Sequence, residues 1–198
     1  MQNNNINRHT GLLATIVVLL GLLGSALVAA QDAGIEIRSA STRLDEGVWY
    51  LSADIGYALN RDTLEALQNG ISLTFQTQME LTRSRRFLPD ETIAELSQDF
   101  ELSWQPLSRG YLVRNKNSGA QRTHPTLFAA LKDLGTLADL PLIDAALISE
   151  GEEYEIRLRA MLDRQQLPGP LRMLAFWDDG YALESAWYGL NLRTGERQ

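Results

Sequence analysis

Two alternating segments between Val48 and Leu81 constrain the fold of this chain more than any other feature. In each segment the apolar residues share one parity: Trp49, Leu51, Ala53, Ile55, Tyr57 and Leu59 in the first, and Ile71, Leu73, Phe75, Met79 and Leu81 in the second. Because successive side chains of a strand point to opposite faces, each segment has one apolar face and one polar face. The pattern is typical of an antiparallel sheet with one face on a core and the other in water.

Between these segments, Asn60 is suited to cap a short helix over residues 61–69, and Gly70 is suited to end it. Alternation recurs elsewhere, and it predicts further strands at residues 35–44, 96–104, 111–114, 120–123, 154–162 and 181–187. Asp45-Glu46-Gly47 predicts a hairpin turn, and so does the stretch 115–119 with its asparagines and glycine.

The remaining segments are predicted as helix or connection. His124-Pro125 opens a helix with Leu127, Phe128, Leu131 and Leu134 on one face and Gly135 at its end. A helical turn is expected at residues 90–93 and another within 167–176, whereas residues 136–148 are expected to form a buried connection. The fold class is therefore mainly β: an antiparallel β-sandwich with two or three short helices, for which an immunoglobulin-like form is one candidate. An α+β layer with the Pro125 helix across one sheet is the alternative.

The first thirty residues are typical of a secretory signal peptide. Arg8 precedes an uninterrupted apolar run over residues 11–27, and Val28-Ala29-Ala30 supplies small residues for cleavage. The alternative is an uncleaved inner-membrane anchor formed by residues 11–30, because about 20 apolar residues suffice to span a bilayer. Residues 31–198 then form a single β-rich domain, and periplasmic localisation is predicted. With no cysteine in the chain, this domain folds without disulfides.

The predicted domain is acidic. Without Arg8 it has 17 basic residues against 25 acidic ones. An acidic surface disfavours nonspecific binding to nucleic acid or anionic lipid. Nucleic acid is thus not an expected partner, and membrane contact is expected only through an uncleaved N-terminal segment.

Several stretches, in their order along the chain, resemble one exported family of Gram-negative proteobacteria, domain of unknown function 4390. They are Tyr111-Leu112-Val113-Arg114-Asn115, Ser118-Gly119, Pro125-Thr126-Leu127, Leu140-Pro141-Leu142-Ile143-Asp144, Tyr154-Glu155-Ile156-Arg157-Leu158-Arg159 and Ser185-Ala186-Trp187-Tyr188. The resemblance implies an envelope location and a gene encoded beside that of a membrane sensor kinase of the nitrogen-regulation type. It supplies no activity and no catalytic residues.

The chain has few groups suited to catalysis. His124 is the single histidine after the signal segment, and it reads more simply as a residue at a helix entry than as a general base. The chain has no Gly-x-Ser-x-Gly motif, EF-hand loop or glycine-rich phosphate loop. Adjacent carboxylates such as Glu152-Glu153 lie near glycine turns and are expected to be solvated loop charges. We therefore expect no enzyme activity, no cofactor and no metal site.

Basic residues and one tryptophan are the candidate partner-binding residues: Arg83, Arg85, Arg86, Arg114, Lys116, Arg122 and Trp177. Guanidinium groups bind carboxylates or phosphates through paired hydrogen bonds. The plainer interpretation is that these residues pair with local acids. Trp49 and Trp104 have inward parity and are expected in the core.

Three functions remain open from the sequence. The favoured one is a non-enzymatic binding or signalling-accessory domain that contacts another envelope protein, with a sensor kinase as one candidate. The alternative is a periplasmic carrier of a small molecule or lipid, with residues 136–148 as the lid or a wall of a cavity between the sheets. A carboxylate-dependent hydrolase of envelope polysaccharide comes third.

Overall fold

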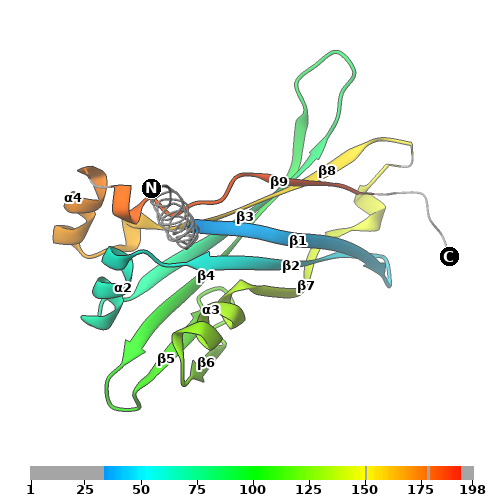
Figure 1. The fold of residues 1–198 in the computed structure, drawn as a ribbon. Coiled ribbons are helices and arrows are strands. Elements are labelled where there is room, and N and C mark those ends of the chain that lie inside the picture. Colours follow the sequence, from blue (N-terminus) through cyan, green and yellow to red (C-terminus); the bar gives the residue numbers. More distant parts are fainter. Residues whose placement is uncertain (1–33, 150, 178, 193–198) are drawn as a thin grey trace, which may run out of the picture. The chain divides into compact units, whose positions relative to one another are not determined.

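Two antiparallel sheets build the domain, as the computed structural model shows for residues 34–149, 151–177 and 179–192 (Figure 1). The predicted fold class, mainly β with a sandwich of two sheets and three short helices, is confirmed. The predicted signal peptide or anchor lies outside the described residues. Within those residues, no helix has the length and apolar character needed to cross a membrane.

The smaller sheet has the strand order β1-β2-β7, and the larger sheet has the order β6-β5-β4-β3-β8-β9. The strands are β1 Gly34–Asp45, β2 Val48–Ala58, β3 Leu73–Arg83, β4 Glu91–Gln105, β5 Gly110–Asn115, β6 Gln121–His124, β7 Thr136–Asp144, β8 Tyr154–Leu162 and β9 Tyr188–Leu192. Immunoglobulin-type sandwiches divide their strands almost evenly between two sheets. The immunoglobulin likeness therefore does not extend to the strand order of this domain.

Helices and single 3₁₀ turns connect these strands. They are α2 Arg61–Gln68, α3 Leu127–Gly135, α4 Gly169–Trp177, η1 Ala145–Leu147, η2 Arg164–Gln166 and η3 Asp179–Tyr181. The α2 helix begins as predicted, because the Asn60 side chain accepts a hydrogen bond from the Thr63 backbone N–H at 2.9 Å. The Asn60 amide also donates to the Gly180 carbonyl, which ties the start of α2 to η3.

The first hairpin forms where the sequence predicts it. Glu46 and Gly47, between β1 and β2, have φ angles of 47° and 80°. Two successive positive φ angles define a type I′ turn, whose twist matches that of the flanking strands. The predicted turn over residues 115–119 is also present, with Gly119 at φ 74°.

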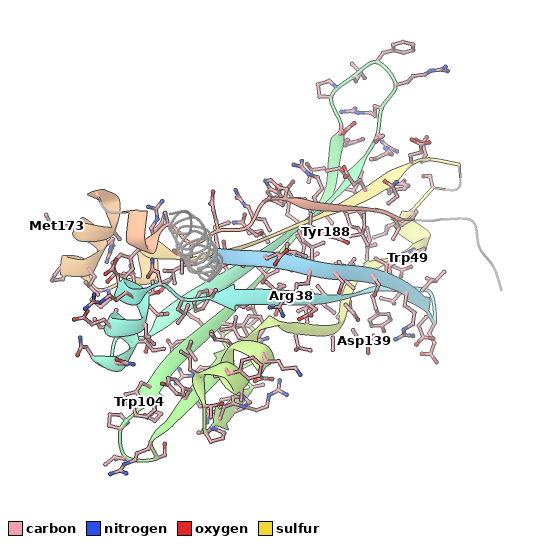
Figure 2. All side chains as sticks on the ribbon, viewed as in Figure 1. Arg38, Trp49, Trp104, Asp139, Met173 and Tyr188 are labelled. Carbon is pink, nitrogen blue, oxygen red and sulfur yellow. The ribbon has the colours of Figure 1, made fainter. Side chains whose placement is uncertain are left out.

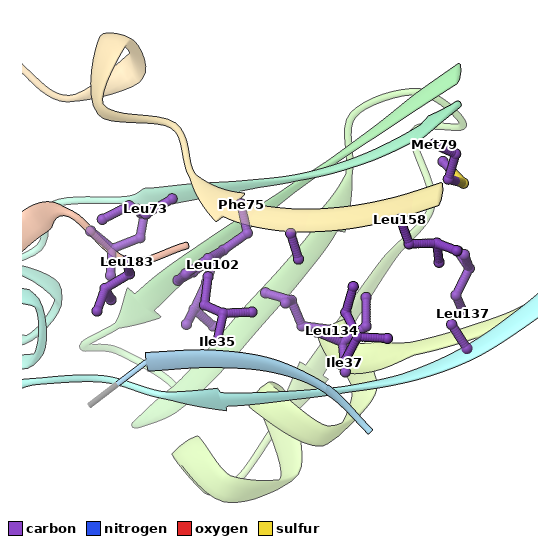
Figure 3. Packing of buried hydrophobic residues seen from close by; sticks show 14 of the residues in the cluster. Ile35, Ile37, Leu73, Phe75, Met79, Leu102, Leu134, Leu137, Leu158 and Leu183 are labelled. Atoms are coloured by element: carbon purple, nitrogen blue, oxygen red, sulfur yellow. The ribbon is translucent and has the colours of Figure 1, made fainter. Parts of the chain in front are cut away.

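The core lies between the inner faces of the two sheets (Figure 3). Phe75, Leu102 and Leu158 of the larger sheet and Leu51 of the smaller one have no exposed surface. These are the positions that alternation assigns to the apolar face, so the parity argument holds for both sheets. Burying one such side chain contributes roughly 1.5–3 kcal/mol.

Two of the tryptophans have distinct surroundings in the fold. Trp49 is buried, and Trp104 packs against Tyr111 with ring centroids 4.8 Å apart. Figure 2 shows Trp49 toward the β1–β2 turn and Trp104 toward the β4–β5 turn. The core assignment thus holds fully for Trp49, and Trp104 lies at the core's edge.

Four local predictions were wrong. Residues 91–93 form the start of β4, not a helical turn, because Glu91 and Thr92 extend the pairing with β3 past a register shift. Residues 136–148 are mostly β7, which pairs with β2; Pro141 and the left-handed Asp139 (φ 46°) obscure its period. The final strand begins at Tyr188, and the residues before it make only the bridge between Met161 and Glu184.

The fourth error concerns α3, which starts later than predicted. Thr126, not Pro125, caps the helix by accepting from the Ala129 backbone N–H at 3.2 Å. The buried face consists of Ala130, Leu134 and Gly135, whereas Phe128 is 79% exposed. Small residues let this helix lie close to β2, which a search for large apolar residues overlooks.

Candidate functional site

A hairpin arm made by β3 and β4 carries the first group of predicted binding residues. β8 pairs with β3 as far as Arg83, beside Tyr154, and residues 84–90 continue beyond as a tip (Figure 1). Phe87 is 90% exposed and Leu88 is 62% exposed at this tip. Large apolar side chains in such positions are typical of interaction surfaces when they cluster.

Glu91 organises the base of the tip. The Arg83 Nη2 atom lies 2.5 Å from the Glu91 Oε2 atom, and the Arg85 Nη1 atom lies 3.9 Å from the same oxygen. The hydrogen bond and charge of Arg83 lower the pKa of Glu91, and Glu91 in turn raises the pKa of Arg83. Arg83 and Arg85 therefore pair with a local acid, as the plainer interpretation predicted.

The third arginine of this group contacts the exposed aromatic ring. The Arg86 Cζ atom lies 6.0 Å from the Phe87 ring centroid, and no ion pair joins Arg86 to an acid within the described residues. Arg85 also donates from its Nε atom to the Pro89 carbonyl at 3.0 Å. The tip thus presents one uncompensated guanidinium beside two exposed apolar side chains.

Along the arm, β4 has an open edge. β5 pairs with β4 only from Phe100 onward. The turn after β5 covers the next positions, because the Asn117 side chain accepts from the Asp99 backbone N–H and donates to the Ser97 carbonyl. From Glu91 to Leu96, no strand of the described residues pairs with this side of β4.

The direction of the edge groups follows from the same contacts. The Asp99 carbonyl accepts from the Lys116 backbone N–H at 2.8 Å, and its own N–H donates to Asn117 at 2.7 Å. Both Asp99 backbone groups therefore point away from β3. Because this direction alternates along a strand, the backbone groups of Ser97 and Glu95 also point to the open side, while those of Leu96 bond to β3.

The second basic group lies far from the first. Arg114 pairs in register with Glu101 and Arg83 pairs with Glu91, both on β4. At about 3.4 Å per residue these two positions are about 30 Å apart along the strand. Arg122 pairs with Asp133 of α3 at 3.2 Å. The structure therefore does not unite Arg114, Lys116 and Arg122 with the arginines at the tip of the arm.

His124 has a structural contact. Its Nε2 atom lies 2.9 Å from the Asp133 Oδ2 atom, which ties β6 to α3. Burial raises the pKa of the Tyr57 hydroxyl, and the Tyr57 ring packs edge-on against the Phe75 ring with centroids 5.0 Å apart. Across residues 34–149, 151–177 and 179–192, no three acidic or histidine side chains gather closely enough to hold a metal ion.

Trp177 ends α4, but its side chain lies outside the described residues. A different tryptophan stands on the outer face of the larger sheet. Arg157 and Arg159 of β8 lie over the Trp187 ring, with their Cζ atoms 4.9 Å and 4.6 Å from its centroid. Sequence parity alone did not single out Trp187, because its two arginine partners belong to another strand.

A cleft on this outer face is the second candidate site, and sequence reasoning missed it. Its volume is about 650 Å³, within the range of roughly 300–1,000 Å³ typical of ligand pockets. Its floor is Gln76 and Gln78 of β3, and its walls come from the end of β8, η2, α4 and the segment after η3. The polar parity of β3 was visible in the sequence, but the walls come from distant segments.

The alternative carrier hypothesis uses residues 136–148 as the lid or a wall of a cavity between the sheets. Residues 136–144 are paired as β7 along β2. The side chains between the two sheets form one contiguous buried cluster. The cleft lies on the opposite face of the larger sheet, lined by the polar side chains of β3.

Together these features define, over the described residues, a β-sandwich domain with an unpaired strand edge and a cleft on the outer face of its larger sheet. The chain belongs to the family described as Domain of unknown function (DUF4390), whose model matches residues 32–191. The resemblance found in the sequence is thereby confirmed. No curated protein and no solved structure matches the chain.

Proposed function

We propose that this protein is an exported, non-enzymatic interaction domain of the cell envelope, which binds a partner protein at the β3–β4 arm. The observation that carries the proposal is the open edge of β4 from Glu91 to Leu96, adjoining the exposed Phe87 and Leu88. An extended segment of the partner adds to this edge as a further strand. Backbone hydrogen bonds then supply affinity, and side-chain contacts supply specificity.

Natural sheets protect their edges with charges, prolines, bulges or covering segments. The β4 edge has two of these devices: the charges of Glu91 and Glu95, and a register shift that leaves Ile93 without a partner on β3. It has no proline and no covering segment among the described residues. These devices discourage pairing between copies of the arm while leaving the edge open to a segment of suitable charge.

The tip indicates the chemistry of that segment. Phe87 and Leu88 favour apolar side chains at the end of the added strand, and Arg86 favours an acidic residue beside them. The export pattern of residues 1–30 and the family resemblance support a periplasmic setting. A membrane sensor kinase is the partner to test first, through its region outside the cytoplasm.

Crosslinking in intact envelopes tests the proposal, with Glu95→Pro as the main variant. The Glu95 N–H points to the open side, so proline removes an edge donor and leaves the β3–β4 hydrogen bonds intact. We expect Glu95→Pro to lose the crosslinked partner and Glu95→Ala, which keeps the N–H, to retain it. A partner captured equally by both variants would refute strand addition.

The tip has its own matched control. Leu107, in the turn at the other end of β4, is fully exposed like Phe87 but has no open edge beside it. Phe87→Asp is expected to reduce crosslinking at least tenfold, and Leu107→Asp is expected to leave it unchanged. Loss with both variants, or a requirement for lipid and not for protein, would overturn the assignment of a protein partner to the tip.

A further inference from the structure

The floor of the outer-face cleft is a chain of hydrogen bonds that runs in one direction. The Arg159 Nη2 atom donates to the Gln78 Oε1 atom at 2.8 Å, and Gln78 Nε2 donates to Gln76 Oε1 at 2.7 Å. Gln76 Nε2 then donates to the Asp99 carboxylate at 3.0 Å. The chain crosses three neighbouring strands, β8, β3 and β4.

The two ends of this chain fix the orientation of both amides. A guanidinium group can only donate hydrogen bonds, and an ionised carboxylate can only accept them. Gln78 must therefore turn its oxygen toward Arg159, and Gln76 must turn its nitrogen toward Asp99. Each amide uses one of its two N–H donors and one of its two acceptor positions, so each retains one donor and one acceptor for a ligand.

The walls of the cleft have balanced charge. Two carboxylates and two guanidinium groups line it: Asp163, Glu184, Arg164 and Arg172. Part of this charge is used within the protein, because Asp163 accepts from the Gln165 backbone N–H at 2.9 Å and Arg164 donates to the Ala175 carbonyl at 3.1 Å. The cleft therefore has no net attraction for either an anion or a cation.

Apolar side chains complete the lining. Met161 and Leu183 lie beside the amide floor, and Leu183 is buried. The cleft thus combines fixed donors and acceptors with small apolar surfaces. A neutral saccharide matches this combination, since its hydroxyl groups both donate and accept and its ring presents C–H faces. A lipid chain would leave the remaining donor and acceptor of each floor amide without a partner, which disfavours it.

We propose that this cleft is a binding site for a neutral saccharide, with Gln76 and Gln78 as the residues that orient its hydroxyl groups. The site is independent of the proposed partner surface. The cleft uses β3 up to Gln78, whereas the tip of the arm begins after Arg83. A saccharide could therefore bind while the β4 edge is occupied.

Titration of the ¹⁵N-labelled domain, followed by NMR, tests the site. The probes are the β-1,4-linked tetrasaccharide of N-acetylglucosamine, maltotetraose and the charged dipeptide glycyl-glutamate. We expect at least one of the two neutral saccharides to cause saturable shifts of the Gln76 and Gln78 side-chain amide signals. No saturable shift with either saccharide, or tighter binding of the dipeptide, would overturn the proposal.

Gln78→Leu removes the central link of the chain, and Glu80→Leu is its matched control. Glu80 lies on the same strand and the same face but outside the cleft. The Kd for the binding saccharide is expected to rise at least tenfold in Gln78→Leu and to stay within twofold of wild type in Glu80→Leu. Equal affinity in the two variants would show that binding does not use the amide floor. The titration of the unaltered domain decides the question even if Gln78→Leu fails to fold.

Discussion

The two faces of the larger sheet are built from the same strands and hold together in different ways. Phe75 and Gln76 are neighbours on β3, yet Phe75 has no exposed surface and Gln76 is half-buried in the hydrogen-bonded chain of the outer face. On the inner face, side chains fit by volume and any apolar residue of similar size serves. On the outer face they fit by direction, because each donor faces a particular acceptor.

This difference separates stability from recognition. Burial of apolar surface is the dominant favourable contribution to folding. Hydrogen bonds of half-exposed groups replace hydrogen bonds to water, so each contributes only about 0.5–1.5 kcal/mol. The chain of hydrogen bonds from Arg159 to Asp99 therefore adds little to stability. Its fixed direction is the feature that the proposed saccharide site uses to orient a ligand.

The largest expected effect on stability comes from truncating each of these two neighbours to alanine in turn. Phe75→Ala should lower the free energy of unfolding by about 3–5 kcal/mol, because it leaves a cavity between the sheets. Gln76→Ala should lower it by less than about 1.5 kcal/mol. Urea denaturation monitored by tryptophan fluorescence measures both. Similar losses for the two variants would show that the outer face contributes to folding as strongly as the core.

A second effect tests how closely the interior is packed where α3 meets the smaller sheet. A Cβ atom on Gly135 would lie 1.9 Å from the Ile55 carbonyl oxygen. Gly135→Ala must therefore push α3 away from β2 and should cost about 1–3 kcal/mol, in the range of other overpacked sites. Gly169→Ala is the control, since a Cβ atom there meets no atom within 4 Å. Equal thermal stability of the two variants would contradict the close approach.

The smallest effect concerns the solvent-facing base of the arm and depends on pH. Arg83 holds the pKa of Glu91 below its ordinary value of 4.5. A carboxylate whose pKa is lowered on folding stabilises the protein above its unfolded pKa, and this contribution disappears as pH falls through the folded pKa. Thermal melts should show a small stability advantage of wild type over Glu91→Gln at pH 7, which shrinks progressively as pH falls below 4.5 toward the lowered pKa of Glu91. An advantage independent of pH would exclude the ion pair as its source.

Much of the fold follows from the sequence because the parity of strand residues is a local property. Alternation identified β1, β2 and β8 to within one residue and β3 to within two, and the caps at Asn60 and Gly70 gave α2 its limits. The segment around β7 could not be found in this way. Its outward and inward positions are both partly covered, and Pro141 lies where the register with β2 shifts.

The binding surfaces were predictable only in part. Arg83, Arg85 and Arg86 are adjacent in sequence, so their grouping was visible, but the exposure of Phe87 depends on where the arm ends. The open edge of β4 depends on where β5 stops beside it, at Phe100. The cleft requires β3, the end of β8 and the segment around Glu184 to lie together, and no local pattern specifies that arrangement. Sites assembled from distant segments in this way can be predicted only when the strand order is already known.

The strand order also sets the time at which the larger sheet can close. β3 pairs with two strands that lie at different distances along the chain. β4 follows β3 directly, whereas β8 brings Tyr154 beside Arg83 only after most of the chain has been made. In the smaller sheet, Val48 pairs with Asp144 across a still larger separation in sequence. Sheets that join such distant strands fold slowly, on the millisecond-to-second scale, because the loops must close before the contacts form. A newly made chain would expose the apolar face of its first hairpins until β8 pairs with β3, and a chaperone that holds this face would raise the yield of folded protein.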